Sequence, residues 1–145
     1  MSDEEELARR CAEAMWANDR ASQALGMRIE SVGPGRATLT MPVTELMING
    51  HDICHGGYIV MLADSAFAFA CNTYNRVTVA QTIDVTFLAP VRAGDLLRAE
   101  AVERARRGRS GIYDVTVTRV GAGGEPDEVV AEFRGRSRTL AGSLV

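Results

Sequence analysis

The chain has 145 residues, of which 46% are hydrophobic and 24% charged, with 16 basic against 19 acidic side chains. This length and composition suit one soluble domain, residues 1–145, with a substantial core. The net charge of −3 argues against a nucleic-acid partner, because such proteins present a broad basic surface. No apolar run reaches the length of a membrane span and the acidic N-terminus is no secretory signal, so we expect a cytoplasmic protein without a membrane partner.

Residues 1–20 predict an N-terminal helix. Ser2 can cap its start, and the acidic residues that follow suit the positive end of the helix dipole. The face expected to cover one edge of the core holds Leu7, Cys11, Ala14 and Met15.

The rest of the chain reads as strands around one apolar helix. Two strands, 27–30 and 36–42, flank a Gly-Pro-Gly turn, and an apolar helix is predicted over 56–74. Four segments rich in Val and Thr follow, at 77–88, 96–105, 112–120 and 129–138. Because strands and helices do not alternate, the pattern favours an α+β fold with an antiparallel sheet wrapped around the central helix.

Asp64 is the only ionisable carboxylate in this helix, which is apolar on every side. A charge buried in such a helix costs several kcal/mol unless it is paired, so a functional role is one interpretation. The other is that Asp64 merely hydrogen-bonds a neighbouring loop.

The loop before the helix, residues 49–57, reads Asn-Gly-His-Asp-Ile-Cys-His-Gly-Gly. Paired glycines at a helix start let a ligand approach free backbone N–H groups, which can serve as an oxyanion hole, although such a pair also marks an ordinary tight turn. Gly56 and Asp64 are eight residues apart, or roughly 12 Å along a helix. Both can act on one carbonyl only if two subunits share the site, with their helices antiparallel across a twofold axis.

A metal site is the alternative interpretation of this loop. His51, Cys54 and His55 are metal-ligand types, but no fourth ligand stands at useful spacing, so we expect no metal and no cofactor. The three cysteines lack CxxC spacing, which fits reduced thiols.

Several motifs resemble the hotdog-fold acyl-CoA thioesterases of the phenylacetic acid degradation (PaaI) type. They are Asn49-Gly50-His51-x-x-Cys54-His55-Gly56-Gly57, Leu62-Ala63-Asp64-Ser65-Ala66-Phe67-Ala68, Phe87-Leu88-x-Pro90, Ala93-Gly94-Asp95-x-Leu97 and Phe133-Arg134-Gly135-Arg136-Ser137. The resemblance implies a helix wrapped by a sheet, homodimers joined through that sheet, and usually homotetramers. It also implies that Asp64 is the nucleophile or general base, that the Gly56 N–H binds the thioester oxygen, and that His55 and Asn49 orient the loop and the acyl carbonyl.

The expected substrate is phenylacetyl-CoA or a ring-hydroxylated relative, with other aryl or medium-chain acyl groups left open. Candidate substrate-binding residues are Gly57, Phe67, Arg107, Arg109 and Ser110. Phe67 could instead belong to the core, and the arginine-rich turn at 104–109, a candidate for the coenzyme A phosphates, could instead be a solvated surface. The alternative functions are a hotdog hydratase or dehydratase and a non-catalytic acyl-CoA binding protein. The sequence lacks a GxSxG motif, which argues against a serine hydrolase.

Overall fold

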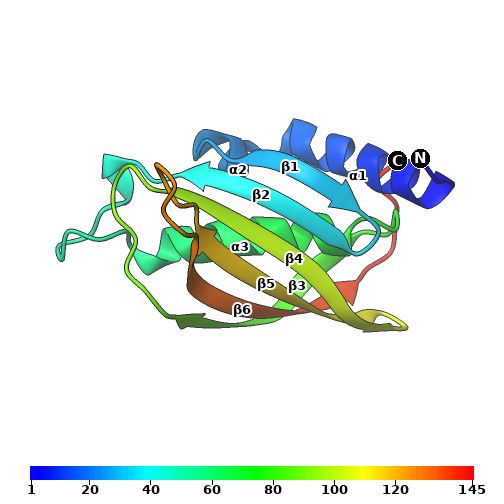
Figure 1. The fold of residues 1–145 in the computed structure, drawn as a ribbon. Coiled ribbons are helices and arrows are strands. Elements are labelled where there is room, and N and C mark those ends of the chain that lie inside the picture. Colours follow the sequence, from blue (N-terminus) through cyan, green and yellow to red (C-terminus); the bar gives the residue numbers. More distant parts are fainter.

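The computed structural model describes all 145 residues (Figure 1). The chain begins with the helices α1 (Asp3–Asn18) and α2 (Arg20–Ala24), followed by β1 (Arg28–Gly33), β2 (Arg36–Pro42) and the 3-10 helix η1 (Glu45–Met47). The central helix α3 (Gly56–Cys71) comes next, and then β3 (Thr78–Phe87), β4 (Leu96–Arg107), β5 (Ser110–Arg119) and β6 (Glu128–Thr139).

All six strands form one sheet, in the order β1-β2-β4-β5-β6-β3, and every neighbouring pair is antiparallel. The sheet curves around α3 (Figure 1), and the edges are β1 on one side and β3 on the other. The predicted α+β hotdog arrangement is therefore confirmed.

The core lies between α3 and the concave face of the sheet. Strands β4, β5 and β6 alternate, turning Val, Ala and Phe side chains inward and charged side chains outward, as expected of a half-buried antiparallel sheet. At Gly135 the ring of Phe67 approaches so closely that an added Cβ would lie 2.7 Å from it. Glycine at this position lets α3 sit tightly against β6.

Helix α1 covers the β1 edge, as predicted, and Ser2 caps it in a capping box with Glu5. The prediction of its buried face was partly wrong. The fully buried residues are Ala8, Cys11 and Ala12, whereas Leu7, Ala14 and Met15 are only half-buried. Small side chains allow α1 to approach the sheet closely, which leaves the longer side chains at the border of the contact.

Helix α3 ends at Cys71, three residues before its predicted end. Asn72 stops it: its side-chain nitrogen donates to the carbonyls of Ala68 (2.8 Å) and Thr78 (2.9 Å), and its oxygen accepts from the Thr78 N–H (2.9 Å). These bonds join the end of α3 to the start of β3. None of the helices has both the length and the apolar character needed to span a bilayer.

Candidate active site

The loop before α3 is held in place mainly by its own main chain. An isolated bridge pairs Ile48 with Cys54, and the N–H of His55 donates to the Met47 carbonyl at 2.7 Å. The side-chain oxygen of Asn49 accepts from the His51 N–H at 2.9 Å, whereas the side-chain nitrogen of Asn49 has no partner. Asn49 therefore shapes the loop and keeps its side-chain NH₂ group free.

His55 caps the start of α3. Its Nδ1 accepts from the Gly57 N–H at 2.9 Å and its carbonyl accepts from the Tyr58 N–H at 3.0 Å. The Gly56 N–H makes no hydrogen bond. Of the donors at the positive end of this helix, Gly56 thus offers an N–H to a ligand, while the N–H of Gly57 is occupied by His55.

A phenylalanine side chain shields the Gly56 position. A Cβ at Gly56 would lie 2.8 Å from the ring of Phe87, the last residue of β3. This close approach explains why the position is glycine, and it places an aromatic wall beside the free N–H.

Asp64 lies on the side of α3 that the sheet does not cover. It shares a stripe, at spacings of three and four residues, with Gly57, Met61 and Ala68, none of which is fully buried. The expectation that Asp64 is buried, which followed from a helix apolar on every side, is therefore met only in part, because Asp64 is half-buried in the single chain. One sheet covers one side of a helix, so the opposite stripe is left half-buried.

The Asp64 carboxylate has no partner in the chain. It takes part in no hydrogen bond or ion pair, and partial burial raises its pKa above the ordinary value for aspartate. The alternative interpretation, that Asp64 only hydrogen-bonds a neighbouring loop, has no support in the structure, because no such bond is present. Gly56 and Asp64 belong to the same uninterrupted helix, so the separation of roughly 12 Å between them stands.

A hollow of about 400 Å³ opens beside the start of α3. It is lined by Leu25, His55, Gly57, Tyr58 and Met61. A hydrogen bond of 2.8 Å between the side chains of Ser22 and Ser65 joins α2 to α3. Leu25 directly follows α2, so this contact places it over α3. Sequence reasoning missed Leu25, because a five-residue helix carries no periodic signal; the Asp19-x-x-Ser22 cap was the available clue.

Phe67 is not placed to contact a substrate. Its side chain is fully buried, and its ring lies 5.6 Å from that of Tyr113 and 5.8 Å from that of Phe133. The structure therefore corrects the expectation of a substrate-binding Phe67: it is a core residue that joins α3 to β5 and β6.

The arginine-rich turn is the β4–β5 hairpin, which contains Arg107, Arg109 and Ser110. Its residues share one small cavity with Cys71 and Tyr74, so the hairpin lies at the C-terminal end of α3. Within one chain, the structure brings Asn49, His55, Gly56 and Gly57 together at the other end. The hairpin and the loop thus lie at opposite ends of the central helix (Figure 1).

The other ligand-type side chains near the loop serve the fold. Cys54 is buried, and His55 is occupied as a helix cap. No three His, Cys, Asp or Glu side chains gather in a group that could hold a metal ion.

Known proteins resemble this chain in both sequence and fold. The family described as "Thioesterase superfamily" matches residues 51–124. The acyl-coenzyme A thioesterase PaaI of Escherichia coli is 41% identical over 133 residues, which cover 92% of this chain and 91% of that protein. The structure of the E. coli PaaI protein from the phenylacetic acid degradation operon superposes with a TM-score of 0.90 at 40% identity, covering 96% of this chain and 97% of that one.

A mutant structure of the phenylacetic acid degradation protein PaaI from Thermus thermophilus has a TM-score of 0.77 at 34% identity, and covers 84% of this chain and 100% of that one. These similarities run through the loop, the central helix and the sheet alike. The chain therefore belongs to the thioesterase superfamily, and within it to the hotdog acyl-CoA thioesterases of the PaaI type.

Proposed function

We propose that the chain hydrolyses acyl-CoA thioesters, with the Gly56 N–H as the donor to the thioester oxygen and Asp64 as nucleophile or general base. The observation that carries this proposal is the free Gly56 N–H at the positive end of α3, beside neighbours that are already hydrogen-bonded. The carbonyl oxygen gains negative charge in the transition state. A prearranged donor aimed at that oxygen is worth about 3 to 4 kcal/mol, or roughly a hundredfold to a thousandfold in kcat.

The unpaired Asp64 carboxylate is suited to either chemical role. Asp64 forms no ion pair and no side-chain hydrogen bond, so its carboxylate oxygens are available to attack a carbonyl or to accept a proton from water. Single turnover in labelled water separates the two routes. Label in the Asp64 carboxylate supports attack by Asp64 through a mixed anhydride that water opens at the Asp64 carbonyl. Unlabelled Asp64, with no acylated Asp64 found under adequate trapping, supports activation of water.

We further propose that two copies of the chain share each site. Gly56 and Asp64 are too far apart in one helix, and the Asp64 stripe is open. The neighbouring edge strand β3 has an unpaired backbone edge and exposes Val79, Ile83 and Phe87, each by 44 to 50%. Pairing of β3 with its counterpart would cover this edge and bring the two α3 stripes together antiparallel, giving a homodimer with two equivalent sites, from which a homotetramer can be built.

The proposed substrates are phenylacetyl-CoA and its ring-hydroxylated relatives. Support comes from the phenylacetic acid degradation operon of the E. coli relative and from the apolar hollow next to Gly57, which Leu25, Tyr58 and Met61 line. Turnover numbers for phenylacetyl, hydroxybenzoyl and hexanoyl thioesters rank the acyl groups. We also propose a cytoplasmic location, which the three free cysteines fit.

Release of free thiol from these thioesters tests the function. Asp64→Asn should lose nearly all turnover and still bind acyl-CoA; near-normal turnover would remove Asp64 from the mechanism.

The Gly56 donor is tested by Gly56→Pro, which removes the N–H, against Gly56→Ala, which keeps it. Both variants add the same Cβ beside Phe87, so both are made with Phe87→Ala to give that carbon room. Gly56→Pro should lose far more turnover than Gly56→Ala, and equal losses would exclude the N–H as the donor.

A further inference from the structure

The segment between β3 and β4, residues 88–95, lies against the loop that precedes α3, at the same end of the molecule (Figure 1). The N–H of Cys54 donates to the Val91 carbonyl at 2.7 Å. The guanidinium of Arg92 donates to the Asp52 carbonyl at 3.3 Å, across 40 residues of sequence. Both bonds reach the main chain of the loop shortly before Gly56.

The β3–β4 segment is itself fixed to the sheet. Within it, the Arg92 N–H donates to the Asp95 carboxylate at 2.8 Å. The N–H of Val43, which directly follows β2, donates to the Asp95 carbonyl at 2.8 Å. The Gly94 N–H donates to the Val43 carbonyl, also at 2.8 Å. The segment is thus anchored at the end of β2 and can hold the loop from outside.

Asp52 is the residue of the loop that most needs such a hold. Its φ is +63°, in the left-handed region that residues other than glycine seldom adopt. A backbone in this region persists where its surroundings fix it. The Asp52 N–H donates to the Asn49 carbonyl at 3.1 Å, within the loop. The bond from Arg92 is therefore the one hydrogen bond that ties Asp52 to the rest of the fold.

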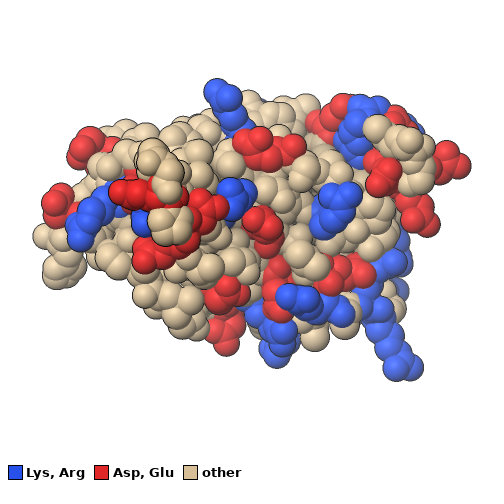
Figure 2. All heavy atoms as spheres, viewed as in Figure 1, with Lys and Arg blue, Asp and Glu red and all other residues tan.

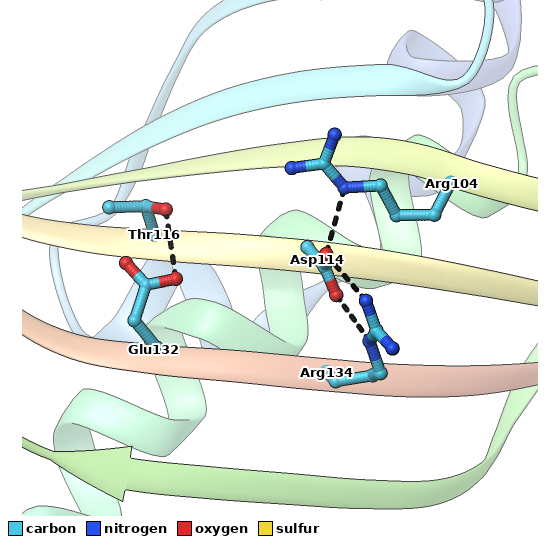
Figure 3. Close-up of polar contacts among 5 residues, drawn as sticks. All are labelled: Arg104, Asp114, Thr116, Glu132 and Arg134. Carbon is cyan, nitrogen blue, oxygen red and sulfur yellow. Dashed lines mark hydrogen bonds and ion pairs between the residues drawn. The ribbon is translucent and has the colours of Figure 1, made fainter.

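Arg92 differs from the other arginines in what it binds. On the sheet, Asp114 accepts from Arg134 at 2.7 and 2.9 Å and from Arg104 at 2.8 Å (Figure 3). Figure 2 shows side chains of both signs interspersed over this face of the molecule. Arg92 forms no ion pair, and it is the only arginine whose side chain donates to a main-chain carbonyl. No carboxylate competes with the loop for its charged donors, which form stronger hydrogen bonds than neutral ones.

We propose that Arg92 is a positioning residue of the active site, which fixes the loop so that the free Gly56 N–H points at the thioester oxygen. This inference rests on the proposed thioesterase function and adds a residue that touches no substrate. Arg92 acts through the main chain of the loop, since its bond to Asp52 and the bond from Cys54 to Val91 fix the residues that lead into Gly56.

The direction of this donor matters for the rate. A donor stabilises the oxyanion only when it is already aimed at the oxygen, and a misplacement of about 1 Å can cost roughly a hundredfold in rate. A loop that loses one of its two outside bonds should hold the Gly56 N–H less well. The substrate would still bind, because its other contacts are unchanged.

The test replaces Arg92 with alanine and with lysine. Arg92→Ala should lower kcat for phenylacetyl-CoA by at least about fivefold and leave KM within about twofold of the original. Arg92→Lys keeps a charged donor on a long side chain and should recover more than about half of the lost kcat. The matched control is Arg28→Ala, because Arg28 is also exposed and unpaired but lies at the start of β1. Its kcat and KM should stay within about twofold of the original.

A second thioester, phenylacetyl-N-acetylcysteamine, separates positioning from direct contact, because it lacks the nucleotide part of coenzyme A. Arg92→Ala should lose kcat by the same factor with both thioesters. A loss confined to phenylacetyl-CoA, or a rise in KM at unchanged kcat, would mean that Arg92 contacts the substrate and would overturn the positioning role.

Amide hydrogen exchange tests the inference without any turnover. Peptides that cover residues 49–57 should exchange at least about threefold faster in Arg92→Ala than in the original protein, while peptides of β5 keep their rate. Unchanged exchange in the loop overturns the inference, whatever the effect on kcat. If the original protein hydrolyses no thioester, faster exchange in the loop still supports the hold of Arg92 on the loop, and the proposed function alone fails.

Discussion

His55 accepts a hydrogen bond from Gly57 with its side chain, and its replacement separates a structural role from contact with substrate. His55→Ala removes the cap and leaves the Gly57 N–H to water. Loss of such a cap lowers the free energy of unfolding by about 1 kcal/mol. For a chain of this length, that shift corresponds to a fall in Tm of roughly 3 °C.

The effect on turnover should exceed the effect on stability. Without the cap, the first turn of α3 frays and the neighbouring Gly56 N–H loses its fixed direction, so kcat should fall by more than about tenfold. His55→Asn is the matched variant, because asparagine is among the best capping residues. It should recover the lost Tm and most of the lost kcat.

Thermal denaturation and initial rates of thiol release on the three proteins decide the question. Recovery of Tm without recovery of kcat in His55→Asn would mean that the imidazole itself contacts the substrate. Identical Tm values for all three proteins would refute the capping role altogether.

Three further predictions concern stability. Phe67→Ala leaves a cavity between α3 and β6 and should lower the free energy of unfolding by about 3 to 5 kcal/mol in urea denaturation. Gly135→Ala overfills the same contact and should lower it by about 1 to 3 kcal/mol. A small effect of both substitutions would place Phe67 outside the core. Burial raises the pKa of Asp64, so the contribution of Asp64 to stability is lost as pH rises through that pKa. Asp64→Asn should therefore have a higher Tm than the original protein at neutral pH, and the difference should vanish in acid. A lower Tm of the variant at pH 7 would contradict this. Arg134 and Arg104 lower the pKa of Asp114 to about 2, so the stabilisation by Asp114 is present above its unfolded-state pKa near 3.8 and is lost as pH falls toward 2. Asp114→Asn should have a lower Tm than the original protein at pH 5, and its Tm should fall little further below pH 3. A fall in Tm below pH 3 that parallels that of the original protein would refute this role of Asp114.

The elements that sequence predicts well here are those with long, repeated patterns. Alternating Val and Thr residues locate four of the six strands, and the apolar run after the Gly56-Gly57 pair locates the central helix. Helices α2 and η1 are too short to show a period, and their caps and neighbours decide their conformation.

The site depends on information that one-dimensional patterns lack. The neighbours of Asp64 in sequence are apolar, but only the packed sheet shows which stripe of α3 stays open. Arg92 is 40 residues from Asp52 in the sequence, and only the fold brings its guanidinium to the Asp52 carbonyl. Phe67 illustrates the converse case, because an aromatic residue on a buried helix reads equally as pocket or core until its neighbours are known.

The most direct test of the account is complementation between two inactive variants, because the central claim is that Gly56 and Asp64 of different subunits form each site. Asp64→Asn and Gly56→Pro are each prepared with Phe87→Ala, then unfolded, mixed in equal amounts and refolded together. Random pairing makes half of the dimers mixed, and each mixed dimer restores one of its two sites, so the mixture should recover about a quarter of the turnover of the Phe87→Ala protein. A mixture that forms mixed dimers and stays as inactive as its parents would contradict the shared site.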